Sequence, residues 1–313
     1  MSLVNWKGVY PAVLTPFKED ETIDFGMFKT NIEAQLEAGV DGIVLGGSLG
    51  EASTLVKDEK KELLLFTKDF VERVPVILNI AEQSTRYAVA AAEEAEANGA
   101  DGLMLLPPMR YNADARETVM FFKTIARHTS LPIMIYNNPA DYKITVTLDM
   151  FEQMAAVPNI QAVKESTRDV SNVTRMINRF DDRFKILTGV DPLALESLCA
   201  GADGWVAGLV GAFPKETVAI YRLIKAGYYA EALKIYRWFL PVLDLDIHPK
   251  LVQYIKLAAT LTGISTEHVR APRLPLEGEE RARVTAIIEE ALDNRPALPG
   301  YLHLQPLENA QLA

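Results

Sequence analysis

One lysine in the sequence stands where it could act as a nucleophile. Lys164 directly follows the short apolar run Ile160 to Val163, which is typical of a buried strand. A lysine amine removed from water has a lowered pKa and can attack a carbonyl carbon. The alternative is an ordinary cation at a strand end, paired with Glu165 or with a neighbouring loop. The spacing alone leaves both interpretations open.

A tyrosine ends the apolar run before that of Lys164. Tyr136 closes the run Ile133 to Tyr136, so its phenol could reach the same substrate carbonyl. A positioned tyrosine can relay a proton, although a core tyrosine with a satisfied hydroxyl is the commoner case. Asn138-Pro139, just beyond it, is most simply a turn.

A glycine-rich segment follows an earlier apolar run. Gly46-Gly47-Ser48-Leu49-Gly50 could expose backbone amides and a hydroxyl near the next helix, as a site for a carboxylate or phosphate. The segment lacks the lysine and the spacing of a nucleotide-triphosphate loop. A small carboxylate is therefore the better candidate, and a purely structural turn remains open.

Metal and thiol chemistry are not expected. The four histidines have no metal-binding spacing, and one cysteine cannot supply a thiolate cluster or an internal disulfide. Cys199 lies in the apolar stretch LESLCAGA and is expected to be a small buried residue. We therefore predict no metal and no cofactor.

The elements that must position these residues are indicated by a phrase that recurs three times. AGVDGIVL begins at Ala38, NGADGLML at Asn98 and AGADGWVA at Ala200. Each reads as a helix end, a glycine stop, a tight turn and a strand buried on both faces. Five further apolar runs bring the expected strands to eight: Gly8 to Leu14, Val76 to Ile80, Ile133 to Tyr136, Ile160 to Val163 and Phe184 to Thr188.

Amphipathic stretches separate the strands, and the unit recurs about every 20–35 residues, as βα repeats require. The pattern predicts an α/β fold, a closed (β/α)8 TIM barrel, since no nucleotide fingerprint follows the first strand. After Pro214 the pattern is purely helical, which predicts a C-terminal helical extension. We expect a barrel domain over residues 1–225, a helical domain over 226–296 and an irregular tail over 297–313.

Composition limits the possible partners. The 313 residues carry 32 Lys and Arg against 42 Asp and Glu, a net charge of −10 that opposes a role in coating nucleic acid. The N-terminus lacks the pattern of a signal peptide, and no apolar run is long enough to span a bilayer. A cytoplasmic protein without nucleic-acid or membrane partners is expected.

Taken together, the strand ends resemble the dihydrodipicolinate synthase and N-acetylneuraminate lyase superfamily. The resemblance extends from about Gly8 to Asn294, and its motifs occur in the family's order: PAVLTPF, GSLGE, YNNP, VKES, TGVD and GADGWVAGLVGAFP. It implies a Schiff-base enzyme on a (β/α)8 barrel that needs no metal and forms a homodimer or homotetramer. Its substrate would be a small 2-oxo acid or imino acid.

The resemblance also implies roles for individual residues. Lys164 would form the imine and Tyr136 would relay protons. Ser48, with the amides of Ser48 and Leu49, would hold the substrate carboxylate. Three positions would lie near the bound substrate, namely Gly189, Asp191 and Gly208, and Asn138 would contribute to binding as well.

The sequence departs from the dihydrodipicolinate synthases at several of these positions. Their two consecutive threonines are replaced by Ser48-Leu49, and the arginine of their strand-five loop is absent from Ala140-Asp141-Tyr142. The loop after strand four carries Arg110 and Tyr111 with one apparent extra residue, so either could substitute for the tyrosine relay of that family. Ile80-Ala81-Glu82 replaces their strand-three glycine-threonine-glycine motif. Dihydrodipicolinate synthesis is therefore disfavoured.

The GSLGE and YNNP variants look more like catabolic members of the superfamily. These include 1-pyrroline-4-hydroxy-2-carboxylate deaminases and 2-keto-3-deoxy sugar acid dehydratases, which both eliminate a group beta to the imine-forming carbon. The small carboxylate loop and the uncharged Asn138 favour the deaminase. A pyruvate-dependent aldolase is the next alternative, and a non-catalytic barrel that only binds a 2-oxo acid is another.

Overall fold

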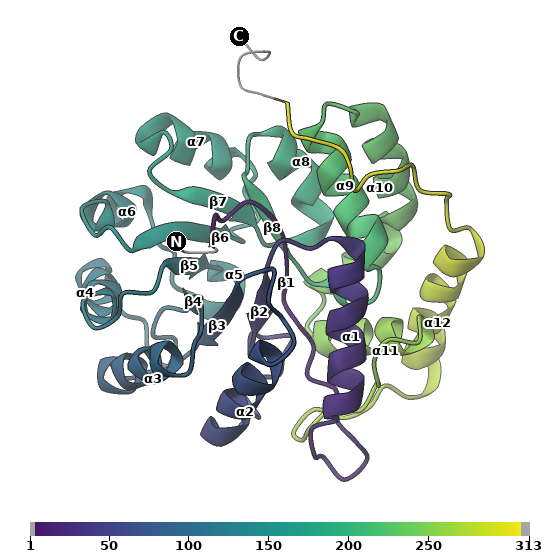
Figure 1. Ribbon diagram of the computed structural model, residues 1–313, viewed down its shortest axis with the longest axis horizontal. Coiled ribbons are helices and arrows are strands. Elements are labelled where there is room, and N and C mark those ends of the chain that lie inside the picture. The colour runs from purple at the N-terminus through teal and green to yellow at the C-terminus, as the bar shows by residue number, and fades with distance from the viewer. Residues whose placement is uncertain (1–3, 308–313) are drawn as a thin grey trace.

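The computed structural model describes residues 4–307, and within them eight parallel strands form a nearly closed barrel surrounded by helices (Figure 1). The strand order follows the chain around the barrel, β1-β8-β7-β6-β5-β4-β3-β2. The strands are β1 (Gly8–Pro11), β2 (Ile43–Leu45), β3 (Val76–Ile80), β4 (Gly102–Leu105), β5 (Ile133–Asn137), β6 (Ile160–Glu165), β7 (Lys185–Thr188) and β8 (Gly204–Ala207). The sequence-based prediction of a (β/α)8 barrel is confirmed.

Closure between β1 and β2 is the weakest part of the ring. Only a parallel bridge between Ala12 and Val44 joins them, with the Val13 N–H donating to the Val44 carbonyl at 3.0 Å. The apolar run from Gly8 predicted a longer first strand. In the structure β1 ends at Pro11, which has no N–H to donate to a neighbouring strand, although the N–H groups of Ala12 and Val13 still bond to Ala207 and Val44.

The recurring phrase of the sequence forms the same junction three times at the amino-terminal end of the barrel. Its glycine has a positive φ each time, for example 88° at Gly39, which ends α1. Its aspartate then accepts a hydrogen bond from the backbone of a neighbouring strand: Asp41 from Val9, Asp101 from Val76 and Asp203 from Ile186. The phrase therefore recurs because each copy links a helix end to the start of an adjacent strand.

Helices cover the outside of the barrel between successive strands (Figure 1). They are α1 (Phe25–Ala38), α2 (Lys57–Lys68), α3 (Thr85–Ala97), α4 (Ala115–Ala126), α6 (Leu148–Met154), α7 (Ser171–Phe180), α8 (Ala194–Cys199) and α9 (Pro214–Lys225). Short turns of helix lie at the strand ends: α5 (Pro139–Tyr142), η1 (Asp191–Leu193) and η2 (Leu209–Gly211). The first of these replaces the simple turn that Asn138-Pro139 predicted.

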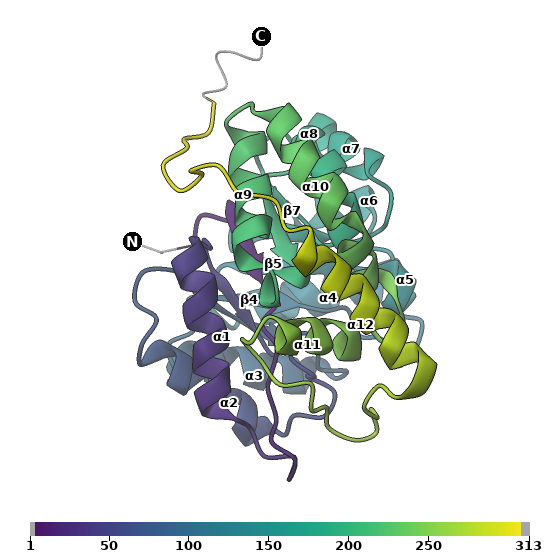
Figure 2. The same ribbon diagram turned by 90° about the vertical axis from the view of Figure 1, so that its right-hand side faces the viewer.

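Further helices follow the barrel: α10 (Tyr229–Leu243), η3 (Asp244–Ile247), α11 (Leu251–Leu261) and α12 (Gly278–Asp293). They pack on one side of the barrel beside α9 (Figure 2), and η3 lies against η1. The helical extension is thus confirmed, while the domain boundaries at 225 and 296 remain predictions. Beyond α12, the described part of the tail runs back along the barrel, where the Leu307 N–H donates to the Lys225 carbonyl.

Cys199 is exposed, so the expectation of a buried cysteine is wrong. The buried residues of α8 are Ala194, Ser197 and Leu198, which share one face of the helix. The cysteine follows them in the last turn and points to solvent.

A buried ion pair joins the helical extension to the loop after β2. The Lys256 ammonium lies 2.5 Å from a Glu51 carboxylate oxygen, and both side chains are fully buried. Glu51 also accepts the Arg270 N–H at 3.2 Å, and Arg273 lies 3.5 Å from it. Burial lowers the pKa of Lys256 to about 8. Because Glu51 ends the Gly-Gly-Ser-Leu-Gly-Glu segment, this pair anchors the loop that carries Ser48.

Replacing Lys256 with methionine is expected to lower the free energy of unfolding by about 3 kcal/mol, because the Glu51 carboxylate stays buried without its main partner. Urea denaturation followed by tryptophan fluorescence measures the change. Lys250→Met is the control, since Lys250 forms its ion pair with Glu280 at the surface, where solvent screens the attraction. Equal stability of the two variants would contradict the anchoring role of the buried pair.

None of the helices in residues 4–307 combines the length and the apolarity needed to span a bilayer. Across the same residues, histidine, cysteine and carboxylate side chains form no group of three that could hold a metal ion.

Candidate active site

Lys164 lies inside the carboxyl-terminal mouth of the barrel. It is a strand residue rather than the residue after the strand, because β6 continues to Glu165, and its side chain is only 7% exposed. Alternation along the strand places Glu165 on the opposite face. There the Glu165 carboxylate accepts hydrogen bonds from Asn172 and the Thr167 backbone. The alternative in which Lys164 pairs with Glu165 is therefore excluded.

The environment of Lys164 favours its neutral amine. Burial lowers its pKa, although the carboxyl groups of Asp246 and Asp191 oppose the shift. Within residues 4–307 its ammonium forms no ion pair, and Nζ lies 4.2 Å from the centre of the Tyr136 ring. The amine is thus held next to an aromatic face with its nitrogen available for reaction.

Tyr136 is the register partner of Lys164 on the neighbouring strand β5. Its hydroxyl accepts a hydrogen bond from Asn138 Nδ2 at 3.0 Å, and burial raises the pKa of the phenol. Asn138 also caps α5, where it accepts the Asp141 N–H and donates to the Asp141 carboxylate. The short helix α5 therefore fixes the side-chain amide of Asn138, and this amide in turn orients the hydroxyl of Tyr136.

A second tyrosine, which the sequence analysis did not single out, lies between Tyr136 and the glycine-rich loop. The Tyr142 ring meets the Tyr136 ring edge to face at 5.5 Å, and its hydroxyl is 2.6 Å from Ser48 Oγ. These contacts connect the loop after β2 with the tyrosine beside Lys164. Tyr142 thus bridges the two hydroxyl-bearing side chains Ser48 and Tyr136.

The loop after β2 presents unused backbone donors. Among the described residues, none accepts a hydrogen bond from the N–H of Ser48 or Leu49. Leu49 is buried, whereas Ser48 is exposed at the mouth. Two adjacent free amides and a hydroxyl form a suitable site for a carboxylate.

Two glycines allow side chains to approach each other in the mouth. A Cβ at Gly189 would lie 2.5 Å from Lys164 Cε and 2.3 Å from Ser166 Oγ. A Cβ at Gly208 would lie 2.7 Å from Asp246 Oδ1 and 3.0 Å from Leu49 Cδ1. Both glycines therefore provide space that any larger residue would fill.

Asp191 supports the floor of the site rather than its open surface. It is fully buried and accepts hydrogen bonds from Trp205 Nε1 at 2.8 Å and from the N–H groups of Gly208 and Leu209 at 3.1 and 2.6 Å. Burial raises the pKa of Asp191, whereas these donors favour its ionised form. Its carboxylate fixes the chain at the end of β8.

Most of the residues singled out from the sequence line one small cavity of about 60 Å³: Ser48, Leu49, Tyr136, Asn138, Lys164, Gly189 and Gly208. Asp191 lies directly behind it. Tyr111 is not among the lining residues and is 55% exposed, so within one chain its predicted relay role finds no support from its position.

Four polar lining residues were not predicted as site residues from the sequence: Asp141, Ser166, Arg168 and Asp246. Ser166 follows Lys164 by two residues, so strand alternation could have identified it. Its hydroxyl is buried and finds no hydrogen-bond partner among the described residues. Asp246 comes from η3 in the helical extension, and its position at the barrel mouth has no local signal in the sequence.

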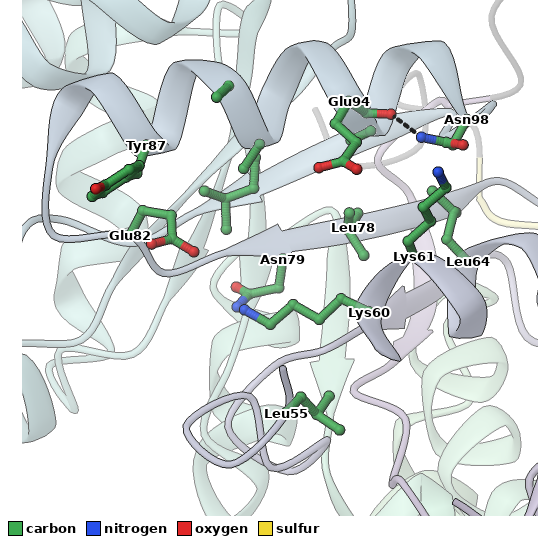
Figure 3. Close-up of a pocket in the computed structure, with 14 residues that line it drawn as sticks. Leu55, Lys60, Lys61, Leu64, Leu78, Asn79, Glu82, Tyr87, Glu94 and Asn98 are labelled. Carbon is green, nitrogen blue, oxygen red and sulfur yellow. Dashed lines mark hydrogen bonds between the residues drawn. The ribbon is translucent and has the colours of Figure 1, made fainter. Parts of the chain in front are cut away.

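A roomier cavity of about 430 Å³ lies elsewhere, between α2, α3 and the end of β3 (Figure 3). Its lining is largely apolar, with Lys60 extending along the groove toward Asn79. None of the residues predicted to bind substrate or to take part in the chemistry lines it. The cavity with the larger volume is therefore not the one that contains the reactive groups, which line the small cavity.

The arrangement around the small cavity is suited to imine chemistry. The lysine amine can act as the nucleophile, the phenol beside it can relay protons, and free amides can hold a carboxylate next to the carbon under attack. A protonated imine then withdraws electrons from the adjacent carbon, so a proton or a leaving group can depart without a full carbanion.

Comparison with known proteins agrees with this chemistry. The model of the dihydrodipicolinate synthetase family matches residues 5–291. A 4-hydroxy-tetrahydrodipicolinate synthase of Bacillus velezensis is 32% identical over 292 residues, covering 92% of this chain and 100% of the relative. The enzyme of the same name from Neisseria meningitidis is also 32% identical, with coverage of 90% and 98%.

Solved structures show the same architecture. The 4-hydroxy-tetrahydrodipicolinate synthase of Methylacidiphilum fumariolicum SolV superimposes with a TM-score of 0.85 at 29% identity, covering 92% of this chain and 97% of that one. A prophage protein of E. coli K12 from the dihydrodipicolinic acid synthase family, solved in complex with pyruvate, gives a TM-score of 0.87 at 26% identity, with coverage of 92% and 99%.

Proposed function

The chain belongs to the dihydrodipicolinate synthetase family, a family of class I Schiff-base lyases, and from that premise we propose that it deaminates 1-pyrroline-4-hydroxy-2-carboxylate. The observation that carries the proposal is the composition of the cavity around Lys164. The cavity is small, and it offers free backbone amides for one carboxylate of the substrate. The protein itself contributes two carboxyl groups to the lining, those of Asp141 and Asp246. A compact substrate with one carboxylate, a hydroxyl and a nitrogen fits this set.

Synthesis of dihydrodipicolinate is the activity that the names of the relatives suggest. The residues of the loop after β5 make dihydrodipicolinate synthesis unfavourable in this chain. Where the synthases carry an arginine for the carboxylate of a second substrate, this chain has Ala140-Asp141-Tyr142, and Asp141 lines the cavity. An aspartate repels a carboxylate, and Tyr142 occupies the space beside Ser48.

The reaction begins at the ring imine. Lys164 Nζ forms a bond to C2 of the protonated imine while the amides of Ser48 and Leu49 hold the carboxylate on that carbon. Tyr136 passes a proton from the lysine nitrogen to the ring nitrogen, the bond between C2 and that nitrogen breaks, and the ring opens. The product is a Schiff base between Lys164 and an open-chain 2-oxo acid that carries a free amine on C5.

The Schiff base then activates C3. The C3 proton leaves through Tyr136 to the freed amine, and the hydroxyl departs from C4 as water after taking up a proton from an acid in the cavity. The double bond moves toward C5, where the resulting imine is hydrolysed with release of ammonia, and hydrolysis at C2 frees Lys164. Overall one water is consumed, and the products are ammonia and a five-carbon 2-oxo acid with a terminal aldehyde.

A substrate panel tests the proposal. We expect the purified protein to release ammonia from 1-pyrroline-4-hydroxy-2-carboxylate, measured with glutamate dehydrogenase, with an aldehyde product that a hydrazine reagent traps. A 2-keto-3-deoxy sugar acid should lose water more slowly, because the cavity of about 60 Å³ suits a compact molecule. Pyruvate with aspartate semialdehyde should give no condensation product. The proposal fails if the pyrroline yields no ammonia while another member of the panel is turned over.

The dimer or tetramer that the family resemblance implies remains a prediction. Light scattering after size-exclusion chromatography measures the mass of the assembly. A mass of a single chain would exclude a second copy beside Tyr111, which is exposed on the single chain.

A further inference from the structure

The mechanism above gives no role to Asp246. Asp246 belongs to η3, beyond the barrel, yet it lines the same cavity as Lys164. Its Oδ2 accepts the Asp191 N–H at 3.2 Å, and its Oδ1 lies over Gly208, at the position that a side chain there would fill. One oxygen is therefore anchored to the backbone, and the other faces the mouth of the barrel.

The neighbours of Asp246 determine which form of its carboxyl group is favoured. The charged groups that face it are Asp191 of η1, Lys164 of β6 and Asp141 of α5. Asp191 receives hydrogen bonds from three residues, whereas among residues 4–307 Asp246 receives only the single Asp191 N–H. When two carboxyl groups interact, the one that accepts more hydrogen bonds holds the charge and the other holds the proton. Asp246 is the carboxyl group that holds the proton.

The proposed reaction requires an acid at this stage. A hydroxyl group leaves poorly as hydroxide, and a proton delivered to its oxygen lets it leave as water. Tyr136 already moves protons at Lys164 and C3. Asp246 enters the cavity from a different element, and it has no cation within ion-pair distance among residues 4–307.

Resting on the deaminase function proposed above, we propose that Asp246 is the catalytic acid that protonates the C4 hydroxyl of the substrate as it departs. The electron pair of the C3–H bond shifts into the carbon chain, the C4–O bond breaks, and the Asp246 proton goes to the departing oxygen. Water leaves, and Asp246 becomes a carboxylate that is reprotonated from the solvent that enters for hydrolysis. The helical extension thereby supplies the group that makes elimination, rather than imine formation alone, possible.

The acid form must persist at physiological pH for this role. Burial, followed by the negative charge of Asp191, raises the pKa of Asp246 to about 8. The group is therefore protonated below that pH and loses its proton as the pH rises through it. We expect kcat for ammonia release to fall above pH 8 in the wild type.

Asp246→Asn tests the role, and Asp244→Asn is the matched control, because Asp244 is an exposed aspartate on the same turn of η3. We expect Asp246→Asn to lower kcat for the pyrroline about 100-fold, a typical loss for removal of a general acid, and to lose the high-pH limb. Asp244→Asn should match the wild type. A 4-fluoro analogue loses fluoride without an acid, so both variants should process it within a few-fold of the wild-type rate.

Pyruvate separates a chemical loss from a structural one. It forms the imine and the enamine but has no group to eliminate, so Asp246→Asn should still exchange the pyruvate methyl protons with deuterium. Undiminished turnover of the pyrroline, or equal losses in exchange, fluoride release and ammonia release, would overturn the proposal. If the wild type exchanges pyruvate protons but releases no ammonia from the pyrroline, the deaminase function has failed, and the role of Asp246 fails with it. An active wild type with an unimpaired Asp246→Asn variant refutes the role of Asp246 alone.

Discussion

Replacing Lys164 with alanine is expected to abolish both turnover and covalent capture of 2-oxo acids. Among the lining residues of the described cavity, Lys164 carries the only amine that could form an imine at C2, so kcat should fall at least about 10,000-fold. Incubation with pyruvate and borohydride followed by intact mass spectrometry should give one adduct on the wild-type chain and none on Lys164→Ala. The same measurement on proteolytic peptides should locate the adduct at Lys164.

Lys60→Ala is the control for this experiment. Burial lowers the pKa of Lys60 as it lowers that of Lys164, but Lys60 lines the cavity between α2 and α3 (Figure 3). If a lowered pKa were sufficient for reaction, Lys60 would also be labelled. We expect Lys60→Ala to retain the full adduct. An adduct that persists on Lys164→Ala would refute the imine mechanism.

Replacing Tyr136 with phenylalanine is expected to lower kcat about 1,000-fold, within the usual range for the loss of a proton relay. The ring contact with Lys164 at 4.2 Å is retained in phenylalanine, so the change removes only the hydroxyl that Asn138 orients. Borohydride capture of pyruvate should therefore slow but still reach completion. Exchange of the pyruvate methyl protons with deuterium should fall in parallel with kcat.

Tyr221→Phe is the matched control for Tyr136→Phe. Tyr221 is also buried, and its hydroxyl donates to the Asp203 carbonyl at the opposite end of the barrel. Removal of that hydroxyl should affect stability without affecting the chemistry. A Tyr136→Phe enzyme with more than a third of the wild-type kcat would show that the proton travels by another route, with Tyr142 as the nearest alternative hydroxyl.

Much of the fold could be predicted from the sequence because its signals are local. Glycines at helix ends, short apolar runs and amphipathic stretches identified the eight strands and the order of the elements. The predicted strand ends were less accurate than the predicted order of the strands. β1 ends early at Pro11, and β6 continues through Lys164 and Glu165.

Two residues show where local signals failed. Cys199 lies in an apolar stretch but points to solvent, because the buried positions of α8 fall on another face. Tyr142 follows Asn138-Pro139, which reads as a turn, and only the helix α5 brings its hydroxyl to Ser48. In both cases the direction of the side chain depends on the helical geometry of a few residues.

The sequence by itself located Lys164, Tyr136 and the loop of residues 46–50, because all three stand at the ends of recognisable strands and such ends meet at one face of a barrel. Only the tertiary structure decided what surrounds them. Asp246 lies 82 residues after Lys164 in the chain, in a helical segment with no motif, and it reaches the cavity because η3 packs against η1 and Gly208 leaves it room. Contacts between such distant segments are set by packing, and packing leaves no periodic pattern in the chain.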